Sequence, residues 1–211
     1  MSKLIIWDWN GTLLNDVKAC VDSMNCMLDK RSVNKITIDY YKSIFTFPVK
    51  KYYQELGFDF DKEPFEELSI EYIDLYKRNS MNSPLQEGVM ELLNLFKSKK
   101  YKQVILSASE QIALENQVKQ RNIFNYFDSL IGLNNIHAKG KVDNAKNFIV
   151  NSPGYDQIIL IGDTMHDLEV AQEINAKCIL VSNGHQVINK EKFNGNAVIV
   201  NTLLDITKLN L

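Results

Sequence analysis

Five short apolar runs, separated by stretches of helical periodicity, constrain the fold of this chain more than any other feature. The runs cover residues 3–7, 103–107, 158–162, 178–182 and 197–200. Residues 89–97 and 167–174 are amphipathic with the helical period. Strands that alternate with helices predict an α/β doubly wound fold, in which helices cover both faces of a parallel sheet.

The stretch from residue 16 to residue 81 breaks this alternation. It contains helical runs such as VKACVDSMNCMLDKR and PFEELSIEYIDLYKR and no convincing strand. Because this block directly follows the first strand, the sequence predicts an all-α domain, residues 16–81, inserted into a core of residues 1–15 and 82–211. Residues 15–16 would form the outgoing hinge, and the turn-rich residues 79–88 the return linker.

Composition argues against several classes of partner. The formal net charge of -2 gives no global basis for binding nucleic acid or an anionic membrane surface. No apolar run approaches the roughly 20 residues that span a bilayer, and the N-terminus lacks the pattern of a signal peptide. Cys20, Cys26 and Cys178 form neither a CxxC pair nor a zinc-binding pattern. We therefore expect a cytoplasmic protein whose three cysteines are reduced and buried.

Four segments at or near the ends of predicted strands carry complementary polar groups. They contain Asp8 with Gly11 and Thr12, Ser107 in VILSAS, Lys141 in HAKGKVDN, and Asp163 with Asp167 in ILIGDTMHD. Ligands of open parallel sheets bind at the carboxyl ends of the strands, so these groups are expected to converge. Together they offer a nucleophilic carboxylate, a hydroxyl and a cation for phosphate oxygens, and acids for Mg²⁺.

With these motifs in this order, the chain resembles the haloacid dehalogenase superfamily of phosphohydrolases from its first strand to about Gly184. The resemblance implies a Mg²⁺-dependent phosphatase that acts on a small phosphorylated metabolite. The helical block resembles the cap of phosphoglycolate phosphatase-like members, which closes over the site. A monomer or homodimer is expected.

The resemblance also implies a role for each polar group. Asp8 would attack phosphorus and form an aspartyl-phosphate, and Lys141 would neutralise charge. The residues implied in holding Mg²⁺ are Asp8, Asn10 through its backbone carbonyl, Asp163 and Asp167. The residues implied in binding the phosphoryl group are Gly11, Thr12, Ser107, Ala108 and Lys141. The expected catalytic residues are Asp8, Asn10, Ser107 and Lys141.

Neighbouring residues compete for some of these roles. Ser109 is an alternative to Ser107, and Lys139 is an alternative to Lys141. His166, between the two acids, is expected to point to solvent rather than to bind the metal.

Two further segments have less defined roles. Gly184-His185 follows a predicted strand and is expected at the entrance to the site. Residues 50–53, with sequence KKYY, either meet an anionic substrate or form an amphipathic helix with solvated lysines.

Position 10 departs from the family pattern. An acid usually stands there, where it protonates the leaving group and then activates the hydrolytic water. Asn10 cannot exchange a proton at neutral pH, and loss of a general acid–base group typically costs about 10²–10⁴-fold in rate. We expect Asn10→Asp to speed breakdown of the intermediate, unless a cap group already supplies the base.

Four hypotheses remain open for Asn10. The cap supplies the acid–base group, or the leaving group needs no proton. The chain resembles phosphonoacetaldehyde hydrolases, with Lys50 or Lys51 forming a Schiff base. The protein is a phosphate-binding module with low turnover. Alternatively, the Asn10 amide hydrolyses to restore an aspartate.

Overall fold

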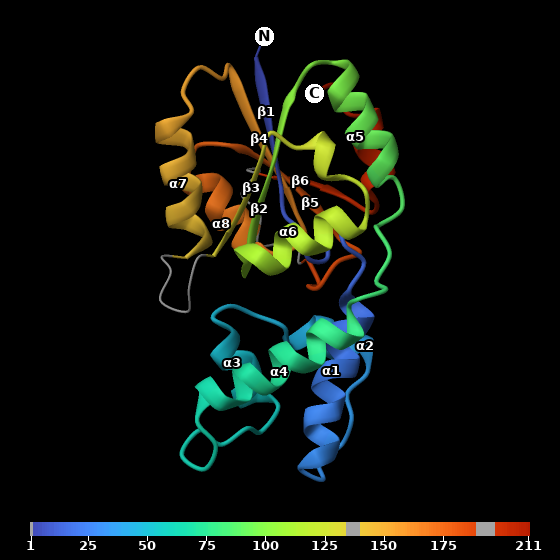
Figure 1. Ribbon diagram of the computed structural model, residues 1–211, viewed down its shortest axis with the longest axis vertical. Helices are drawn as coiled ribbons and strands as arrows, with labels where there is room; N and C mark the ends of the chain where they lie inside the picture. The colour runs from blue at the N-terminus through green and yellow to red at the C-terminus, as the bar shows by residue number, and fades with distance from the viewer. Residues whose placement is uncertain (1, 134–139, 189–196) are drawn as a thin grey trace.

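A six-stranded parallel sheet forms the centre of the protein. The computed structural model describes residues 2–133, 140–188 and 197–211. Within these residues the strand order is β3-β2-β1-β4-β5-β6 (Figure 1). The strands are β1 (Lys3–Trp7), β2 (Lys102–Glu110), β3 (Ser129–Leu133), β4 (Gln157–Gly162), β5 (Lys177–Val181) and β6 (Ala197–Val200). This arrangement confirms the predicted α/β doubly wound fold, although β3 was not among the predicted strands.

Helices cover both faces of the sheet, as Figure 1 shows. The α-helices of this layer are α5 (Val89–Ser98), α6 (Gln111–Gln120), α7 (Lys141–Asn151) and α8 (Met165–Glu173), and the 3-10 helices are η1 (Phe124–Tyr126) and η3 (Leu203–Lys208). Successive side chains of a strand point to opposite faces. In β1, Ile5 and Trp7 therefore pack with α5, α6 and η3, whereas Leu4 and Ile6 pack with α7 and α8.

A second group of helices lies beyond the carboxyl ends of the strands, in the lower half of Figure 1. It consists of α1 (Val17–Lys30), α2 (Ile38–Ile44), α3 (Val49–Glu55) and α4 (Phe65–Asn79). These helices share a separate hydrophobic core that includes Met24, Met27, Tyr53 and Leu68. An independent core is what an inserted domain requires, and the proposed boundaries at residues 15/16 and 81/82 stay a prediction.

The two chain segments that connect the helical group to the sheet are hydrogen-bonded to each other. The Asn15 amide donates to the Pro84 carbonyl at 2.9 Å, and the Gln86 amide donates to the Leu13 carbonyl at 2.9 Å. The outgoing and returning segments therefore lie side by side, which holds the start of α1 close to the end of β1.

The cysteine prediction is only partly correct. Cys20 and Cys178 are buried, but Cys26 is exposed because it lies on the outer face of α1. Among the described residues, no helix combines the length and apolar character that a membrane-spanning segment needs.

Candidate active site

Asp8 follows β1 directly and begins a tight turn. Its amide donates to the Ile161 carbonyl at 2.8 Å, which extends the sheet pairing by one residue. Gly11 has a φ of +75°, and a Cβ atom at this position would lie 2.3 Å from Oδ2 of Asp163. Only glycine fits both the left-handed backbone and this close approach. The Gly-Thr turn thereby brings the end of β1 against the end of β4.

Three buried carboxylates meet at this edge of the sheet. Suitable oxygen atoms of Asp8, Asp163 and Asp167 all lie within 4.8 Å of one another. The Thr12 hydroxyl donates to Oδ1 of Asp163 at 2.9 Å, and the His185 amide donates to its Oδ2 at 2.6 Å. The structure therefore brings together the acids that the sequence predicted, and they could hold a metal ion.

Lys141 lies at the start of α7 and reaches two of these acids. Its buried Nζ donates to Oδ1 of Asp8 and, at 2.6 Å, to Oδ1 of Asp167. The other Asp167 oxygen accepts from the amide and hydroxyl of Thr164, at 3.0 and 2.7 Å, and so caps α8. Asp167 thus both caps α8 and pairs with Lys141. The competing Lys139 lies outside the described residues.

The crowded carboxylates perturb one another. Burial, together with the nearby charges of Asp167 and Asp163, holds the pKa of Asp8 well above its usual value despite the attraction of Lys141. Burial likewise raises the pKa of Asp163 to about 6, with Asp167 adding to the shift. For Asp167, burial alone would raise the pKa, but the Lys141 ammonium and the hydrogen bonds from Lys141 and Thr164 together lower it. One buried ammonium among three acids leaves a surplus of negative charge that a cation would stabilise.

Ser107 lies inside a strand, so its expected place at a strand end is incorrect. Strand β2 continues to Glu110, with a register shift against β3 between Leu106 and Glu110. Ser107 is buried, and its hydroxyl accepts a hydrogen bond from the Ser109 amide at 3.0 Å. The pairing of Trp7 with Ile105 places this segment on the strand next to Asp8.

The Asn10 side chain is held from two sides. Its Oδ1 accepts from the Ser109 hydroxyl at 2.8 Å, on the core. Its Nδ2 donates to Oδ2 of Asp16 at 2.8 Å and to the Tyr76 hydroxyl of α4 at 2.7 Å. Asn10 thus joins the sheet to the helical group, and Ser109 takes part by orienting it.

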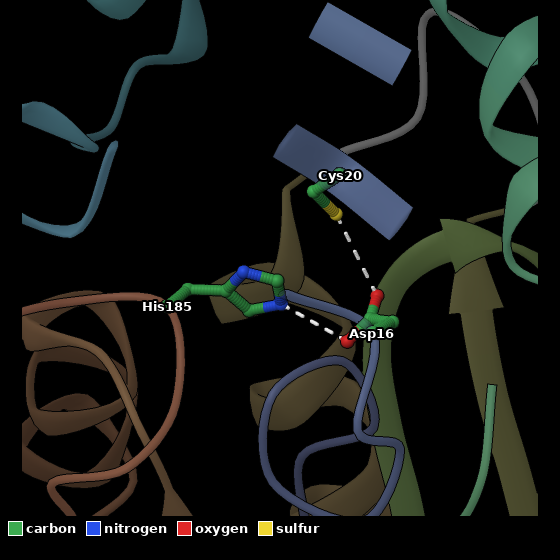
Figure 2. A group of neighbouring side chains, drawn as sticks. All are labelled: Asp16, Cys20 and His185. Carbon is green, nitrogen blue, oxygen red and sulfur yellow. Dashed lines mark hydrogen bonds and ion pairs between the residues drawn. The ribbon is translucent and has the colours of Figure 1, made fainter. Parts of the chain in front are cut away.

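Asp16 is a residue of the candidate site that the sequence pattern did not identify. It was assigned to a hinge, but it is fully buried and accepts from the Gly11 amide at 2.9 Å and the Tyr76 hydroxyl at 2.6 Å. Figure 2 shows it between Cys20 and His185, with His185 Nε2 at 3.1 Å from Oδ1. His185 was expected at an entrance and is instead buried. Carboxylate and imidazole are separated by 169 residues, so no local pattern signals the pair.

The Asp16–His185 contact is an ion pair. Burial alone would lower the pKa of His185, but Asp16 raises it to about 9. Conversely, burial alone would raise the pKa of Asp16, but the charge of His185 and the hydrogen bonds from His185, Tyr76 and Asn10 together lower it. The ligand atoms of Asp16, Cys20 and His185 lie within 4.8 Å of one another, as a metal site would require. Metals bind neutral imidazole, however, and the second nitrogen of His185 already contacts the Tyr41 hydroxyl at 2.8 Å.

A cavity of about 700 Å³ opens beside Asp8. Its lining combines residues of the sheet edge, among them Asn10 and Ala108, with residues of the helical group, among them Tyr52 and Tyr76. The Asp8 carboxylate and the buried Lys141 ammonium both line this space. Such a site can bind an anionic group and attack it with Asp8.

Comparison with known proteins identifies the family. The family model described as haloacid dehalogenase-like hydrolase matches residues 5–181. The chain belongs to the haloacid dehalogenase-like hydrolases. This confirms both the predicted family and the prediction that the protein is an enzyme. No curated protein matches the chain.

Solved structures share the fold of this hydrolase. A predicted phosphatase from Clostridium acetobutylicum is 21% identical with a TM-score of 0.78, and the match covers 99% of this chain and 97% of that one. Hydrolase SP0104 from Streptococcus pneumoniae is 18% identical with a TM-score of 0.83, covering 98% and 97%. A predicted phosphoglycolate phosphatase from Haemophilus somnus is 18% identical with a TM-score of 0.79, covering 98% and 97%. At these identities the likeness shows the fold alone.

The lining of the cavity tests the predictions that remain for this hydrolase, those for residues 50–53 and for His166. Tyr52 lines the cavity, but neither Lys50 nor Lys51 is among the described residues that do. Lys50 Nζ instead lies 5.0 Å from the centre of the Phe60 ring. The structure therefore gives no support to a Schiff base on these lysines. His166 also departs from expectation, because it lines the cavity rather than simply pointing to solvent.

We expect Asn10→Asp to lower the free energy of unfolding of the hydrolase by about 1–3 kcal/mol. The substitution replaces a hydrogen bond to the buried Asp16 by a contact between two carboxylates, the new one at a partly buried position. Urea denaturation of both proteins measures the difference. The double variant Asn10→Asp/Asp16→Asn, which again places one amide beside one carboxylate, should recover part of the loss. An unchanged stability in the single variant would contradict this contact.

Proposed function

We propose that this hydrolase is a Mg²⁺-dependent phosphatase that cleaves a phosphate monoester of a small metabolite through a covalent intermediate on Asp8. The convergence of three buried carboxylates and the Lys141 ammonium beside a cavity that Asp8 and Lys141 line carries the proposal. The likeness to structures named as phosphatases, one of them a predicted phosphoglycolate phosphatase, supports it.

The donor set fits Mg²⁺. Carboxylate oxygens are its preferred ligands, and the surplus negative charge among the three acids calls for a cation. Asp8, Asp163, Asp167 and the backbone carbonyl of Asn10 would hold the ion, which when bound compensates charge on the phosphoryl oxygens. The proximity of the three acids, rather than their order in the sequence, supports this assignment.

Hydrolysis would proceed in two displacements at phosphorus, with Asp8 as the nucleophile of the first. A carboxylate oxygen of Asp8 attacks phosphorus, the bond from phosphorus to the leaving oxygen breaks, and the leaving oxygen takes a proton from water. A water molecule then attacks phosphorus, loses a proton to solvent, and releases inorganic phosphate and free Asp8. Lys141 balances charge on the phosphoryl group.

The remaining proposed contacts with the phosphoryl group come from the turn and from β2. They are made by Gly11, Thr12, Ser107 and Ala108. Asn10 orients groups through its hydrogen bonds but moves no proton. The faster breakdown expected for Asn10→Asp stays a prediction.

The helical group would act as the cap of this site. The cavity is lined from both sides, with Asp8 and Ala108 on the core and Phe45 and Tyr72 on the helical group. A cap in this position excludes water from the reacting phosphorus and selects the leaving group. A cytoplasmic location and a monomeric or homodimeric state stay predictions.

Phosphate release tests the proposal. The wild-type protein is mixed with a panel of phosphate monoesters and with phosphonoacetaldehyde, with Mg²⁺ or with a chelator. We expect release from at least one ester that requires Mg²⁺. Cleavage of phosphonoacetaldehyde alone would favour the C–P hydrolase hypothesis. No release from any compound would favour a phosphate-binding module with low turnover.

Asp163→Asn is expected to raise the Mg²⁺ concentration needed for half-maximal activity at least about 10-fold. The amide keeps the shape of the side chain but removes one of the negative charges that attract the ion. A Mg²⁺ titration of phosphate release measures the change. Asp205→Asn is the matched control, because Asp205 caps η3 away from the cavity lining. An unchanged response in Asp163→Asn would remove this residue from the metal shell.

A further inference from the structure

The cavity beside Asp8 has an aromatic wall. The wall consists of seven rings from the helical group: Tyr41, Phe45, Phe47, Tyr52, Tyr53, Tyr72 and Tyr76. A cavity of about 700 Å³ offers much more room than a two-carbon leaving group such as glycolate fills. The space beyond the phosphoryl position is therefore shaped for a larger group.

The rings of this aromatic wall support one another. Tyr41 and Tyr52 pack edge to face with centres 5.6 Å apart, and Phe45 and Tyr52 do so at 5.5 Å. Tyr72 and Tyr76 are nearly parallel, with 12° between their planes. Rings held in this way lose little freedom when a ligand packs against them, which favours a flat apolar partner.

The wall also contains a polar atom without a partner. Among the described residues, the buried hydroxyl of Tyr52 has no hydrogen-bond partner, and the side chain is only 2% exposed. Because this oxygen is also inaccessible to solvent, it does not face the open part of the cavity, and the ring rather than the hydroxyl is what Tyr52 offers to a ligand.

Most of the positive charge on the described part of the lining is already paired. Its lysines are Lys141, which is paired with Asp8 and Asp167, and Lys77, which is exposed on α4. The cationic His185 is likewise paired, with Asp16. Lys77 is the one lysine of this lining that forms no ion pair among the described residues, so the lining offers a ligand more aromatic rings than available cations.

We propose that the substrate is a phosphate monoester of an alcohol that carries a flat aromatic ring. The ring would pack against the aromatic wall. This inference rests on the proposed phosphatase function and specifies its substrate class.

The first test compares 2-phenylethyl phosphate with ethyl phosphate in the wild-type protein with Mg²⁺. Both leaving groups are primary alcohols of similar acidity, so the comparison isolates binding of the ring from leaving-group reactivity. Burying one ring predicts a kcat/KM about 100-fold higher for 2-phenylethyl phosphate. Equal values, or a preference for 2-phosphoglycolate over both, would overturn the inference and leave the phosphatase proposal standing.

Two variants localise the effect to the aromatic wall. Phe45→Leu keeps an apolar side chain but removes a ring, and should reduce the preference for 2-phenylethyl phosphate at least about 10-fold. Phe60→Leu is the control, because Phe60 belongs to the same helical group but not to the cavity lining. Equal preferences in the two variants would contradict a role for the wall.

A binding measurement separates failure of this inference from failure of the phosphatase proposal. Calorimetry with Asp8→Asn measures the affinity for both esters without turnover. Tighter binding of 2-phenylethyl phosphate would support ring recognition even if the wild type released no phosphate. Equal or undetectable binding of both esters would overturn it.

Discussion

Asp8→Asn should reduce Mg²⁺-dependent phosphate release by at least about 10⁴-fold, the largest effect that we expect on activity. The amide has nearly the shape of the carboxylate but is not a nucleophile. Lys141 keeps its bond to Asp167 at 2.6 Å in the absence of the Asp8 charge, so the floor of the cavity should stay intact. The loss would therefore report on chemistry rather than on folding.

Rapid quenching and intact-protein mass spectrometry provide the direct measurement. Wild type should gain the mass of one phosphoryl group during turnover, and Asp8→Asn should not. Asp128→Asn is the matched control, because Asp128 pairs with Lys102 at the surface, with side chains 40% and 58% exposed. Phosphate release by Asp8→Asn at the wild-type rate would refute the covalent route.

Asp16→Ala should lower the free energy of unfolding by about 3–5 kcal/mol, the largest effect that we expect on stability. Removing this carboxylate leaves the buried His185 cation without its partner, with the Nε2–Oδ1 contact of 3.1 Å lost. It also removes the acceptor of the Tyr76 hydroxyl and one of the two acceptors of the Gly11 amide, which keeps its bond to the Leu14 carbonyl. The sheet and the helical group would therefore lose the contacts through which Asp16 joins them.

Urea denaturation monitored by circular dichroism measures this loss. Asp22→Ala is the control on α1, because Asp22 pairs with Lys18 at the surface, with side chains 47% and 76% exposed. Such exposed pairs contribute about 0–1 kcal/mol. If Asp16→Ala cost no more than Asp22→Ala, the Asp16–His185 pair would not be the anchor that its burial indicates.

The sheet and the acid cluster could be predicted from sequence because both depend on local patterns. A strand that is buried on both faces is a continuous apolar run, as residues 4–7 illustrate. The polar residues that follow such a strand lie at the carboxyl end of the sheet, where ligands bind. Parallel topology then brings Asp8 and Asp163 together without any knowledge of side-chain packing. Strand β3 escaped prediction because it is a half-buried edge strand with a weak apolar pattern.

The amino-acid sequence by itself thus determined the α/β sheet, the helical block after β1 and the acids at the strand ends. Each of these features depends on residues that are close together in the sequence. Tertiary packing decided how the rest of the site is built. Only the docking of the helical group beside the sheet pairs Asp16 with His185 and turns Asn10 toward Tyr76. These contacts join segments that are far apart in the sequence. The segments approach each other only when the facing surfaces of the sheet and the helical group are buried together, and no local periodicity encodes that.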